Sequence, residues 1–289
     1  MIMQQHPRSP SLRRRRLSAE LRRARIEVPL TAVQAARELG WAVGKLSMIE
    51  NAETKSVKPA DLDKLLDLYK VDDAEKRGAL HQLARDAKER GWWAKYKDVF
   101  RNETLPDFEA EASNLRTYEA QVIPGLLQIP EYTEAIFHGA RYANQEEVKR
   151  QVDARMARRD ILTRFDPVHL RAVIDEAAFH RLIGGKEVML QQLRYLLHMA
   201  QMPHIDVQVL PFSKGAHAGL TAPFVIMSFP SPLDPTIVCV PTLTDALYLE
   251  EPDVVESYSA TFGDIQGSAS SSSESAAFIK AHIDHLESN

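Results

Sequence analysis

The sequence predicts an α+β protein of two domains: an all-α N-terminal domain, then an α+β domain with a mostly antiparallel or mixed sheet. The chain of 289 residues exceeds the usual size of one domain. Amphipathic helical patterns follow one another closely up to residue 71, and β-branched runs gather after residue 169. The expected parts are a disordered tail over residues 1–11, a helical domain over 12–71, a connecting helix over 72–98 and the α+β domain over 99–289.

Short amphipathic helices are predicted throughout the N-terminal domain. Pro29 ends the first, Thr31 is a suitable N-cap for the second, Gly40 permits the turn after it, and Pro59 opens the fourth. Each segment carries apolar residues at helical spacing. The residues expected to face inward are Leu17, Leu21, Ala24, Ala35, Ala36, Leu39, Leu46, Ile49, Leu62, Leu65, Leu66 and Tyr69.

Strands and helices are both expected in the second domain. β-branched runs bounded by Pro, Gly and Asp predict strands over 169–175, 205–212, 223–229, 236–240 and 245–250. Helical patterns occupy 130–139, 146–165, 186–201, 251–262 and 272–286. The close spacing of strands after residue 205 favours antiparallel or mixed pairing. The run GSASSSSES has the composition of a linker, but Ser271 and Glu274 form a capping-box pattern that favours the start of the last helix.

Composition and charge exclude several classes of protein. No apolar run approaches the roughly 20 residues that span a bilayer, and the polar, basic start is not a secretory signal, so a cytoplasmic protein is expected. The single cysteine, Cys239, lies in an apolar run and is expected to be a buried hydrophobe. Residues 1–58 hold 12 Lys and Arg against 5 Asp and Glu, although the formal net charge of the chain is -4. This basic front suggests a segment that meets polyanions.

One segment near the N-terminus carries most of the functional information. The small Ala36 lets two helices approach, Gly40 turns the chain, and Leu46 helps to lock the following helix in place. The segment resembles the helix-turn-helix of the lambda-repressor-like family, the Cro/CI or XRE type, and the family's acidic-leucine helix follows as DLDKLLDLY. The resemblance implies a recognition helix in the DNA major groove. An ordinary helical hairpin is the structural alternative. The matching residues are Thr31, Ala36, Leu39, Gly40, Leu46, Ile49, Glu50 and Asn51.

The DNA-facing positions of the motif are less typical than its core. Ala42 stands where the family commonly has a capping hydroxyl worth about 1 kcal/mol, and Gly44 weakens the helix by up to about 1 kcal/mol. Met48 stands where a basic residue is frequent. Lys45 is expected to reach a guanine edge or a phosphate, and Val43 a thymine methyl. The predicted DNA-binding residues are Arg16, Arg22, Thr31, Arg37, Val43, Lys45, Ser47 and Met48.

Basic residues surround this motif in the sequence, namely Arg13, Arg14, Arg15, Arg16, Arg22, Arg23, Arg25, Arg37 and Lys55. We therefore expect binding to double-stranded DNA that is driven by phosphate contacts and is sensitive to salt. Base discrimination by a monomer is expected to be modest. A homodimer would restore specificity by doubling the contacts.

The rest of the chain carries a second resemblance, in segments over 91–93, 118–136, 152–162, 173–185, 188–197, 207–219 and 247–255. These resemble an antitoxin-like domain of uncharacterised function that follows this helix-turn-helix in many actinobacterial regulators. The resemblance implies a transcription regulator and a small partner protein encoded nearby. One departure is IVCVP over 237–241, where relatives tend to have an aromatic and an acidic residue.

The sequence holds none of the standard catalytic motifs, such as G-x-S-x-G, G-x-G-x-x-G, a P-loop or H-E-x-x-H. We expect no cofactor and no metal site. His282 and His285 have a spacing that suits a metal, but histidines near a helix end are more commonly solvated. Residues at strand ends or on loops are candidate contacts for a ligand or partner, namely Arg116, Glu119, Glu176 and His217.

Three functions stay open at this point. The leading hypothesis is a DNA-binding transcription regulator whose C-terminal domain dimerises, binds a partner or senses a ligand. The second is an antitoxin-like protein-interaction module with a vestigial DNA-binding helix. The third is an enzyme that uses a pocket in the C-terminal domain.

Overall fold

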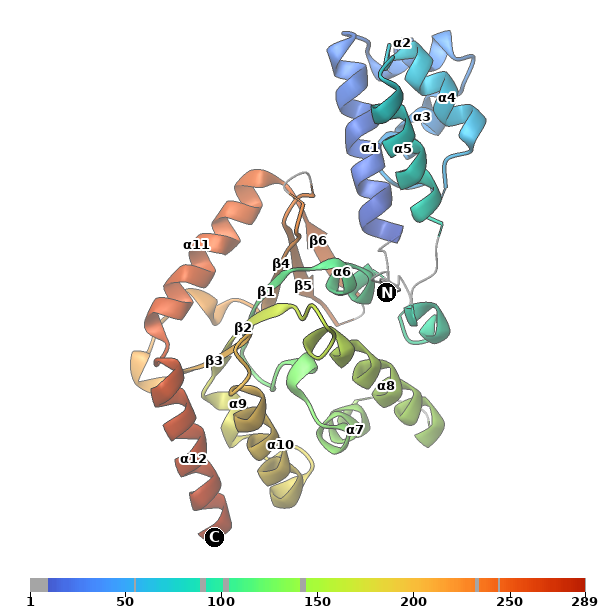
Figure 1. Ribbon diagram of the computed structural model, residues 1–289. Helices are drawn as coiled ribbons and strands as arrows, with labels where there is room; N and C mark the ends of the chain where they lie inside the picture. Colours follow the sequence, from blue (N-terminus) through green and yellow to red (C-terminus); the bar gives the residue numbers. More distant parts are fainter. Residues whose placement is uncertain are drawn as a thin grey trace. The chain divides into compact units, whose positions relative to one another are not determined.

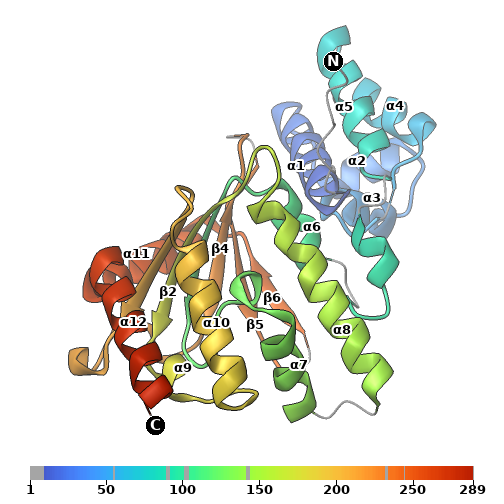
Figure 2. The ribbon, with the colours of Figure 1, turned by 60° about the horizontal axis from the view of Figure 1, so that its bottom comes forward.

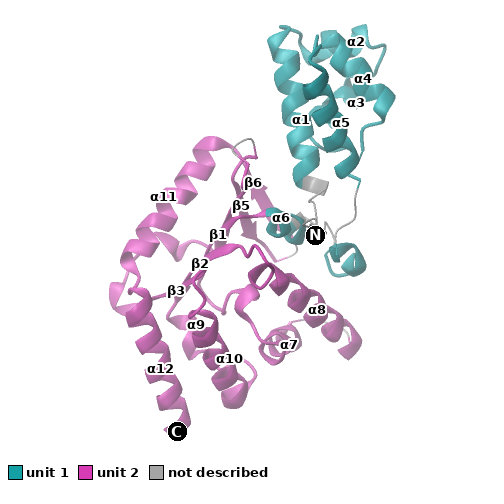
Figure 3. Cartoon of the chain, in the orientation of Figure 1, with its two compact units in different colours: residues 1–111 teal, residues 112–289 magenta. Residues whose placement is uncertain are grey.

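The computed structural model describes residues 10–54, 56–88, 92–100, 104–140, 144–231, 234–243 and 245–288 (Figure 1). The chain divides into unit 1, residues 1–111, and unit 2, residues 112–289 (Figure 3). Unit 1 is helical, and unit 2 combines a mixed sheet with helices, which confirms the predicted α+β class. Most of the tail predicted over 1–11 lies outside the described residues, and a helix begins at Pro10.

Within the residues that the structure describes, unit 1 consists of helices. Its elements are α1 (Pro10–Glu27), α2 (Ala32–Glu38), α3 (Val43–Glu50), α4 (Pro59–Leu68), α5 (Ala74–Asp86), the 3-10 helix η1 (Trp92–Tyr96) and α6 (Thr104–Glu111). The first helix thus includes the arginine run that precedes Arg16. The predicted inward-facing residues lie in one apolar core, with Leu39 partly buried at its edge.

The turn between α2 and α3 is built as the sequence predicts. Thr31 caps α2: the backbone N–H of Gln34 donates to the Thr31 hydroxyl, and the Gln34 side chain accepts from the Thr31 N–H at 2.9 Å. Gly40 adopts a φ of +65°, in the left-handed region that glycine tolerates best. Ala42 precedes α3 without a side-chain cap, as its methyl group requires.

The region predicted as one connecting helix over 72–98 holds α5 and η1 as separate elements. Asp73 caps α5 by accepting from the N–H groups of Glu75 and Lys76. Leu80 and Ala84 belong to the apolar core of unit 1, because α5 packs along α1. The helix therefore completes the helical unit, and the expectation of a connector was wrong because its apolar face has a partner.

Unit 2 is organised around a sheet with the strand order β3-β2-β1-β4-β5-β6. Its strands are β1 (Asn114–Glu119), β2 (His169–Asp175), β3 (Ile205–Leu210), β4 (Phe224–Ser228), β5 (Ile237–Pro241) and β6 (Ala246–Leu249). β1, β2 and β3 pair in parallel, whereas β1, β4, β5 and β6 pair antiparallel. All the predicted strands are present. The sequence missed β1, whose Asn-Leu-Arg-Thr-Tyr-Glu sequence is too polar to read as a strand.

Helices cover both faces of this sheet, with α11 on one side and α7, α8 and α10 on the other (Figures 1 and 2). Parallel strands need long crossovers, which α7 and α8 supply between β1 and β2 and α10 supplies between β2 and β3. The α-helices are α7 (Pro130–Gly139), α8 (Gln145–Arg158), α9 (Ala177–His180), α10 (Gly185–Met199), α11 (Pro252–Ser268) and α12 (Ser272–Ser288). The 3-10 helices are η2 (Gly125–Leu127), η3 (Arg159–Leu162), η4 (Phe212–Lys214) and η5 (Ala218–Leu220).

The Ser-rich run before α12 is a helix start, as its capping-box pattern predicts. The N–H of Glu274 donates to the Ser271 hydroxyl at 3.3 Å, and the N–H of Ser271 donates to the Glu274 carboxylate at 2.9 Å. Cys239 is buried in β5, as expected. Among the helices of the described residues, none combines the length and apolar character that crossing a bilayer requires.

Candidate functional site

The outer face of α3 is open, while its inner face is held in the core of unit 1. Leu46 and Ile49 are buried. The predicted DNA-facing residues Val43, Lys45 and Met48 are exposed, with Ser47 partly exposed beside them. Asn51 donates from its side-chain amide to the Ser47 hydroxyl at 3.1 Å. The helix therefore presents a surface of four side chains, of which only one is charged.

Lys45 is engaged within unit 1. Its Nζ lies 2.9 Å from Oδ2 of Asp61 and 3.7 Å from the centroid of the Trp41 ring. Trp41 belongs to the turn before α3, and Asp61 to the first turn of α4. Sequence patterns could not predict this pair, because its partners are 16 residues apart.

The arginines of α1 and α2 fall into two groups. Arg22 and Arg37 are exposed, as a role in phosphate contact requires, and Thr31 is exposed at the start of α2. Arg16 is partly buried. Arg13 and Arg15 instead face α6, where Arg13 pairs with Glu111 at 3.1 Å and Arg15 lies 5.3 Å from the Phe108 ring centroid. Lys55 lies outside the described residues.

Arg25 is directed inward, contrary to the expected phosphate contact. Its Nε and Nη2 donate to the carboxylate of Glu50 at 2.9 Å each, and Nη1 donates to the carbonyl of Leu30 at 2.6 Å. Tyr69 donates its hydroxyl to Glu50 at 3.0 Å. The hydrogen bond with Glu50 raises the pKa of Arg25, and burial raises the pKa of Tyr69. This network ties α1, α3 and α4 together on the inner side of α3.

In unit 2, the candidate residues are distributed over both faces of the sheet. Arg116 lies on the α11 side, where it donates to the Ser259 hydroxyl at 3.1 Å and stands over the Phe262 ring. Burial, and then the charge of Arg171 on the adjacent strand, lowers the pKa of Arg116. Glu119 is the last residue of β1, and Glu176 follows β2. Glu119 lies near Arg155 and Arg158 of α8, on the opposite face, so the structure separates Arg116 from Glu119.

Glu176 and His217 belong to a network that holds the loop over 211–223. Glu176 accepts from the N–H of Phe212 at 2.7 Å and lies 3.2 Å from Nε2 of His180. His217 Nδ1 accepts from the N–H of Gly219 at 3.2 Å, so the neutral ring carries its proton on Nε2. That nitrogen lies 3.6 Å from Oδ2 of Asp175. One ring nitrogen of His217 therefore accepts a hydrogen bond from the backbone, and the other faces the Asp175 carboxylate.

Tyr118 completes this network from β1. Burial, followed by the neighbouring carboxylate of Asp175, raises the pKa of Tyr118, whose ring meets that of His217 edge-on. The close approach depends on Gly219: a Cβ at that position would lie 2.6 Å from the Tyr118 ring and 2.9 Å from Ile265. The sequence predicted His217 but missed Asp175 and Tyr118, which become adjacent only through the parallel pairing of β1 with β2.

Glu119 lies in a different setting, on the face covered by α7 and α8. Burial raises its pKa to about 7, and the nearby charges of Arg155 and Arg158 oppose that shift only in part. Among the described residues no side chain donates a hydrogen bond to this carboxylate. Arg155 donates to the amide oxygen of Gln128 at 2.8 Å.

The segment over 120–129 is fastened next to this carboxylate. The fully buried Gln192 on α10 accepts from the N–H of Ile129 at 2.8 Å and donates to the carbonyl of Leu127 at 2.7 Å. Gln128 donates to the carbonyl of Ile123 at 2.6 Å. These contacts hold the segment PGLLQIP, residues 124–130, against α10.

Two family models match the chain. A helix-turn-helix domain model matches residues 16–79, and a model described as a domain of unknown function (DUF5753) matches residues 102–281, more than half of the chain. The chain belongs to the DUF5753 family. The first match confirms the predicted helix-turn-helix in unit 1. No curated protein and no solved structure matches the chain.

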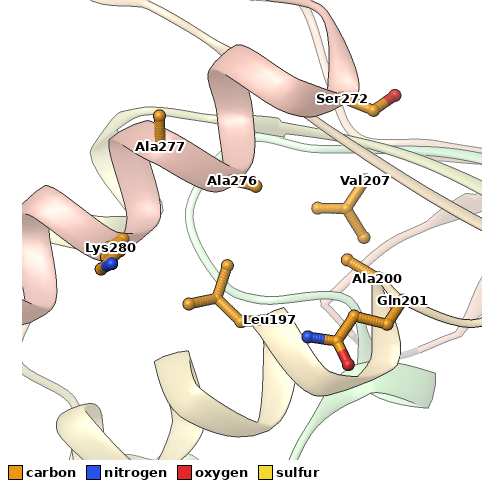
Figure 4. A pocket seen from close by; sticks show the side chains of 8 residues that line it. All are labelled: Leu197, Ala200, Gln201, Val207, Ser272, Ala276, Ala277 and Lys280. Carbon is orange, nitrogen blue, oxygen red and sulfur yellow. The ribbon is translucent and has the colours of Figure 1, made fainter.

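The DUF5753 region contains a cavity of about 310 Å³ between α10, α12 and β3 (Figure 4). Small and apolar side chains form most of its lining, with polar groups at its margin. The lining residues are Leu197, Ala200, Gln201, Val207, Ser272, Ala276, Ala277 and Lys280. The cavity lies apart from the candidate residues predicted from the sequence, none of which lines it.

Of the two histidines near the end of α12, His282 points into unit 2. Its Nε2 lies 2.9 Å from the carbonyl oxygen of Phe179, and its ring stacks on Phe278. Burial lowers the pKa of His282. Within the residues that the structure describes, no three His, Cys, Asp or Glu side chains are grouped so that they could hold a metal ion.

Proposed function

We propose that this protein is a transcription regulator of the XRE type that binds double-stranded DNA through α3. The observation that carries the proposal is the open outer face of α3 in a matched helix-turn-helix domain, flanked by exposed arginines. Val43, Lys45, Ser47 and Met48 would meet base edges in the major groove, where lysine suits guanine and apolar groups suit the thymine methyl. Arg22 and Arg37 would contact phosphates, and Thr31 would set the start of α2 against the backbone.

The Arg25–Glu50–Tyr69 network supports this role indirectly. A recognition helix must be held rigidly to place short side chains at base edges. The network fixes α3 from behind with hydrogen bonds of 2.9–3.0 Å. With Arg13, Arg15 and Arg25 used within unit 1, fewer arginines remain for phosphates than the basic sequence suggests. Affinity of a single copy would be low, which favours action as a homodimer on two half-sites about one helical turn apart.

Replacement of Lys45 and Arg37 together tests the proposal. Lys45→Ala/Arg37→Ala should abolish retention of the protein's own promoter fragment in a gel shift while the circular dichroism spectrum stays unchanged. Lys64→Ala/Arg85→Ala removes two exposed cations from α4 and α5 and is the matched control. Equal retention by both double variants would remove the assignment of α3 as the recognition helix.

For unit 2 we propose a role in dimerisation or in binding a small protein encoded nearby. We also propose that the protein acts in the cytoplasm, where it would reach a bacterial chromosome. The resemblance to antitoxin-like domains supports this. Native mass spectrometry of the full chain, alone and with the neighbouring gene product, would measure both assemblies. The proposal would be contradicted if the chain were strictly monomeric and did not bind that gene product.

A second candidate function is an antitoxin-like interaction module with a vestigial DNA-binding helix. The pairing of Lys45 with Asp61, beside exposed Val43 and Met48, favours it, since an apolar surface suits protein contact. Binding to the protein's own promoter no tighter than to random duplex, together with co-purification of the partner, would support this candidate. We propose no catalytic role for His217, because its side chain is buried and its two ring nitrogens face Gly219 and Asp175, and we propose no cofactor.

A further inference from the structure

The one lysine of the recognition helix is held between two partners from neighbouring elements. Its ammonium group lies against the Asp61 carboxylate at 2.9 Å and over the Trp41 ring at 3.7 Å. Trp41 precedes α3 and Asp61 follows it in α4, so both partners of the lysine come from elements next to α3 in the chain. Both contacts satisfy a positive charge, by ion pairing and by the cation–π interaction.

We propose that Asp61 and Trp41 form a clamp that withholds Lys45 from DNA and so lowers non-specific affinity. The inference rests on the proposed DNA-binding function. Lys45 can contact a phosphate or a base only when it leaves the carboxylate, so Asp61 competes with DNA for the same ammonium group. The charge of Asp61 also repels phosphates near α3. Asp61 thereby becomes a specificity-determining residue, although it need not touch a base.

The strength of the clamp follows from its exposure. The side chains of Lys45 and Asp61 are 42% and 21% exposed, so water and salt screen the pair. Pairs of this kind are weak enough to open when a better partner arrives, and their loss changes an equilibrium constant by about two- to fivefold. The clamp therefore tunes affinity without abolishing it. A guanine edge offers two acceptors, O6 and N7, and is the kind of partner that can replace the carboxylate.

A double-mutant cycle on the full chain tests the clamp. Fluorescence anisotropy would measure binding to a labelled random-sequence duplex for the wild type, Asp61→Asn, Lys45→Ala and the double variant. Asp61→Asn should bind about two- to fivefold more tightly than the wild type. In the Lys45→Ala background, the same change should give a much smaller gain, because the freed ammonium group is absent. The dependence of affinity on salt should steepen in Asp61→Asn by about one phosphate contact.

Asp67→Asn is the matched control, since it removes the same charge from the same helix. Asp67 pairs with Arg77 at 2.8 Å and leaves Lys45 untouched. Asp61 lies in the first turn of α4, where a carboxylate favours the helix, so the melting temperature of each variant is needed. Asp61→Ser provides a second uncharged residue that should act like Asn.

The outcomes separate the clamp from the proposed function. The clamp alone is overturned if the wild type binds duplex but Asp61→Asn does not increase the affinity. It is also overturned if Asp61→Asn increases the affinity equally with and without Lys45. If neither protein binds duplex, DNA binding and the clamp both fail. A gain by Asp61→Asn that needs Lys45 and exceeds that of Asp67→Asn supports the clamp.

Discussion

Unit 1 buries Glu50 and unit 2 partly buries Glu119, and the two carboxylates differ in their hydrogen-bond partners. Glu50 in unit 1 receives hydrogen bonds from Arg25 and Tyr69. Glu119 in unit 2 has arginine charges nearby, but among the described residues no side chain donates a hydrogen bond to it. Burial raises the pKa of Glu119 to about 7.

The difference indicates what each carboxylate is for. A buried ion pair with its hydrogen bonds satisfied holds helices in place, and removal of one partner is costly. A carboxylic acid that is poised to change charge near neutral pH is a typical feature of a site that responds to a ligand or to a neighbouring charge. We therefore expect Glu50 to be structural, and we propose Glu119 as a residue of unit 2 to test for a functional role.

The largest expected effect comes from breaking the satisfied network. Glu50→Ala leaves the Arg25 guanidinium buried without its carboxylate, and should lower the free energy of unfolding of unit 1 by about 3–5 kcal/mol. The tryptophans at 41, 92 and 93 all lie in unit 1, so their fluorescence during urea unfolding reports on this unit. Glu38→Ala, at an exposed position of α2, should change stability by less than about 0.5 kcal/mol. A loss below about 1 kcal/mol for Glu50→Ala would show that the pair is not structural.

The next effect concerns the pH dependence that Glu119 confers on unit 2. The pKa of Glu119 is about 7 in the folded protein against 4.5 for the free group, so the folded state binds the proton more tightly. The contribution of Glu119 to the stability of unit 2 should therefore be largest below pH 4.5, fall as the pH rises towards 7, and level off above it. The total fall is roughly 3 kcal/mol.

Glu119→Gln should remove this fall, because a neutral amide does not titrate. Urea unfolding followed by far-ultraviolet circular dichroism at several pH values would measure it, with the exposed Glu131→Gln as control. Equal pH profiles for the wild type and Glu119→Gln would mean that water reaches the carboxylate freely. That result would remove the contrast with Glu50.

A smaller effect is expected from loosening the segment beside Glu119. Gln192→Leu leaves the N–H of Ile129 and the carbonyl of Leu127 without their partner and should cost about 2 kcal/mol. The pKa of Glu119 should then fall towards 4.5, since the displaced segment admits water. Carbon-13 NMR of the labelled carboxyl group would follow that pKa. Gln191→Leu, the exposed neighbour, is the control, and a shifted pKa in both variants would contradict this account.

Local features of the fold could be predicted from the sequence. Thr31, Gly40 and Ser271 act on residues within a few positions, so their spacing already specifies a cap or a turn. The apolar residues of unit 1 were predicted for the same reason, because helical periodicity is a property of adjacent turns.

Features that depend on distant partners could not be predicted. β1 is stable because it pairs with β2 on one side and β4 on the other, more than 50 and 100 residues away. Arg25 and Glu50 are separated by 25 residues, and either side chain taken alone suits a solvated surface. His217 was predicted as a ligand or partner contact because it lies on a loop. Its neighbour Asp175 lies on another element, and this proximity places the His217 side chain inside the protein.

The smallest effects should come from the two caps that the sequence does specify. Thr31→Ala and Ser271→Ala each remove one side-chain acceptor from a helix start, and each should cost about 1 kcal/mol. Tryptophan fluorescence during urea unfolding would measure the loss of stability in unit 1 caused by Thr31→Ala. Far-ultraviolet circular dichroism would measure the loss in unit 2 caused by Ser271→Ala. Because each capping box is local, the double variant should lose the sum of the two single losses to within about 0.5 kcal/mol. If Thr31→Ala lost several times more stability than Ser271→Ala, the Thr31 hydroxyl would also support the recognition helix. The cap of α2 would then depend on distant contacts, as Glu50 does.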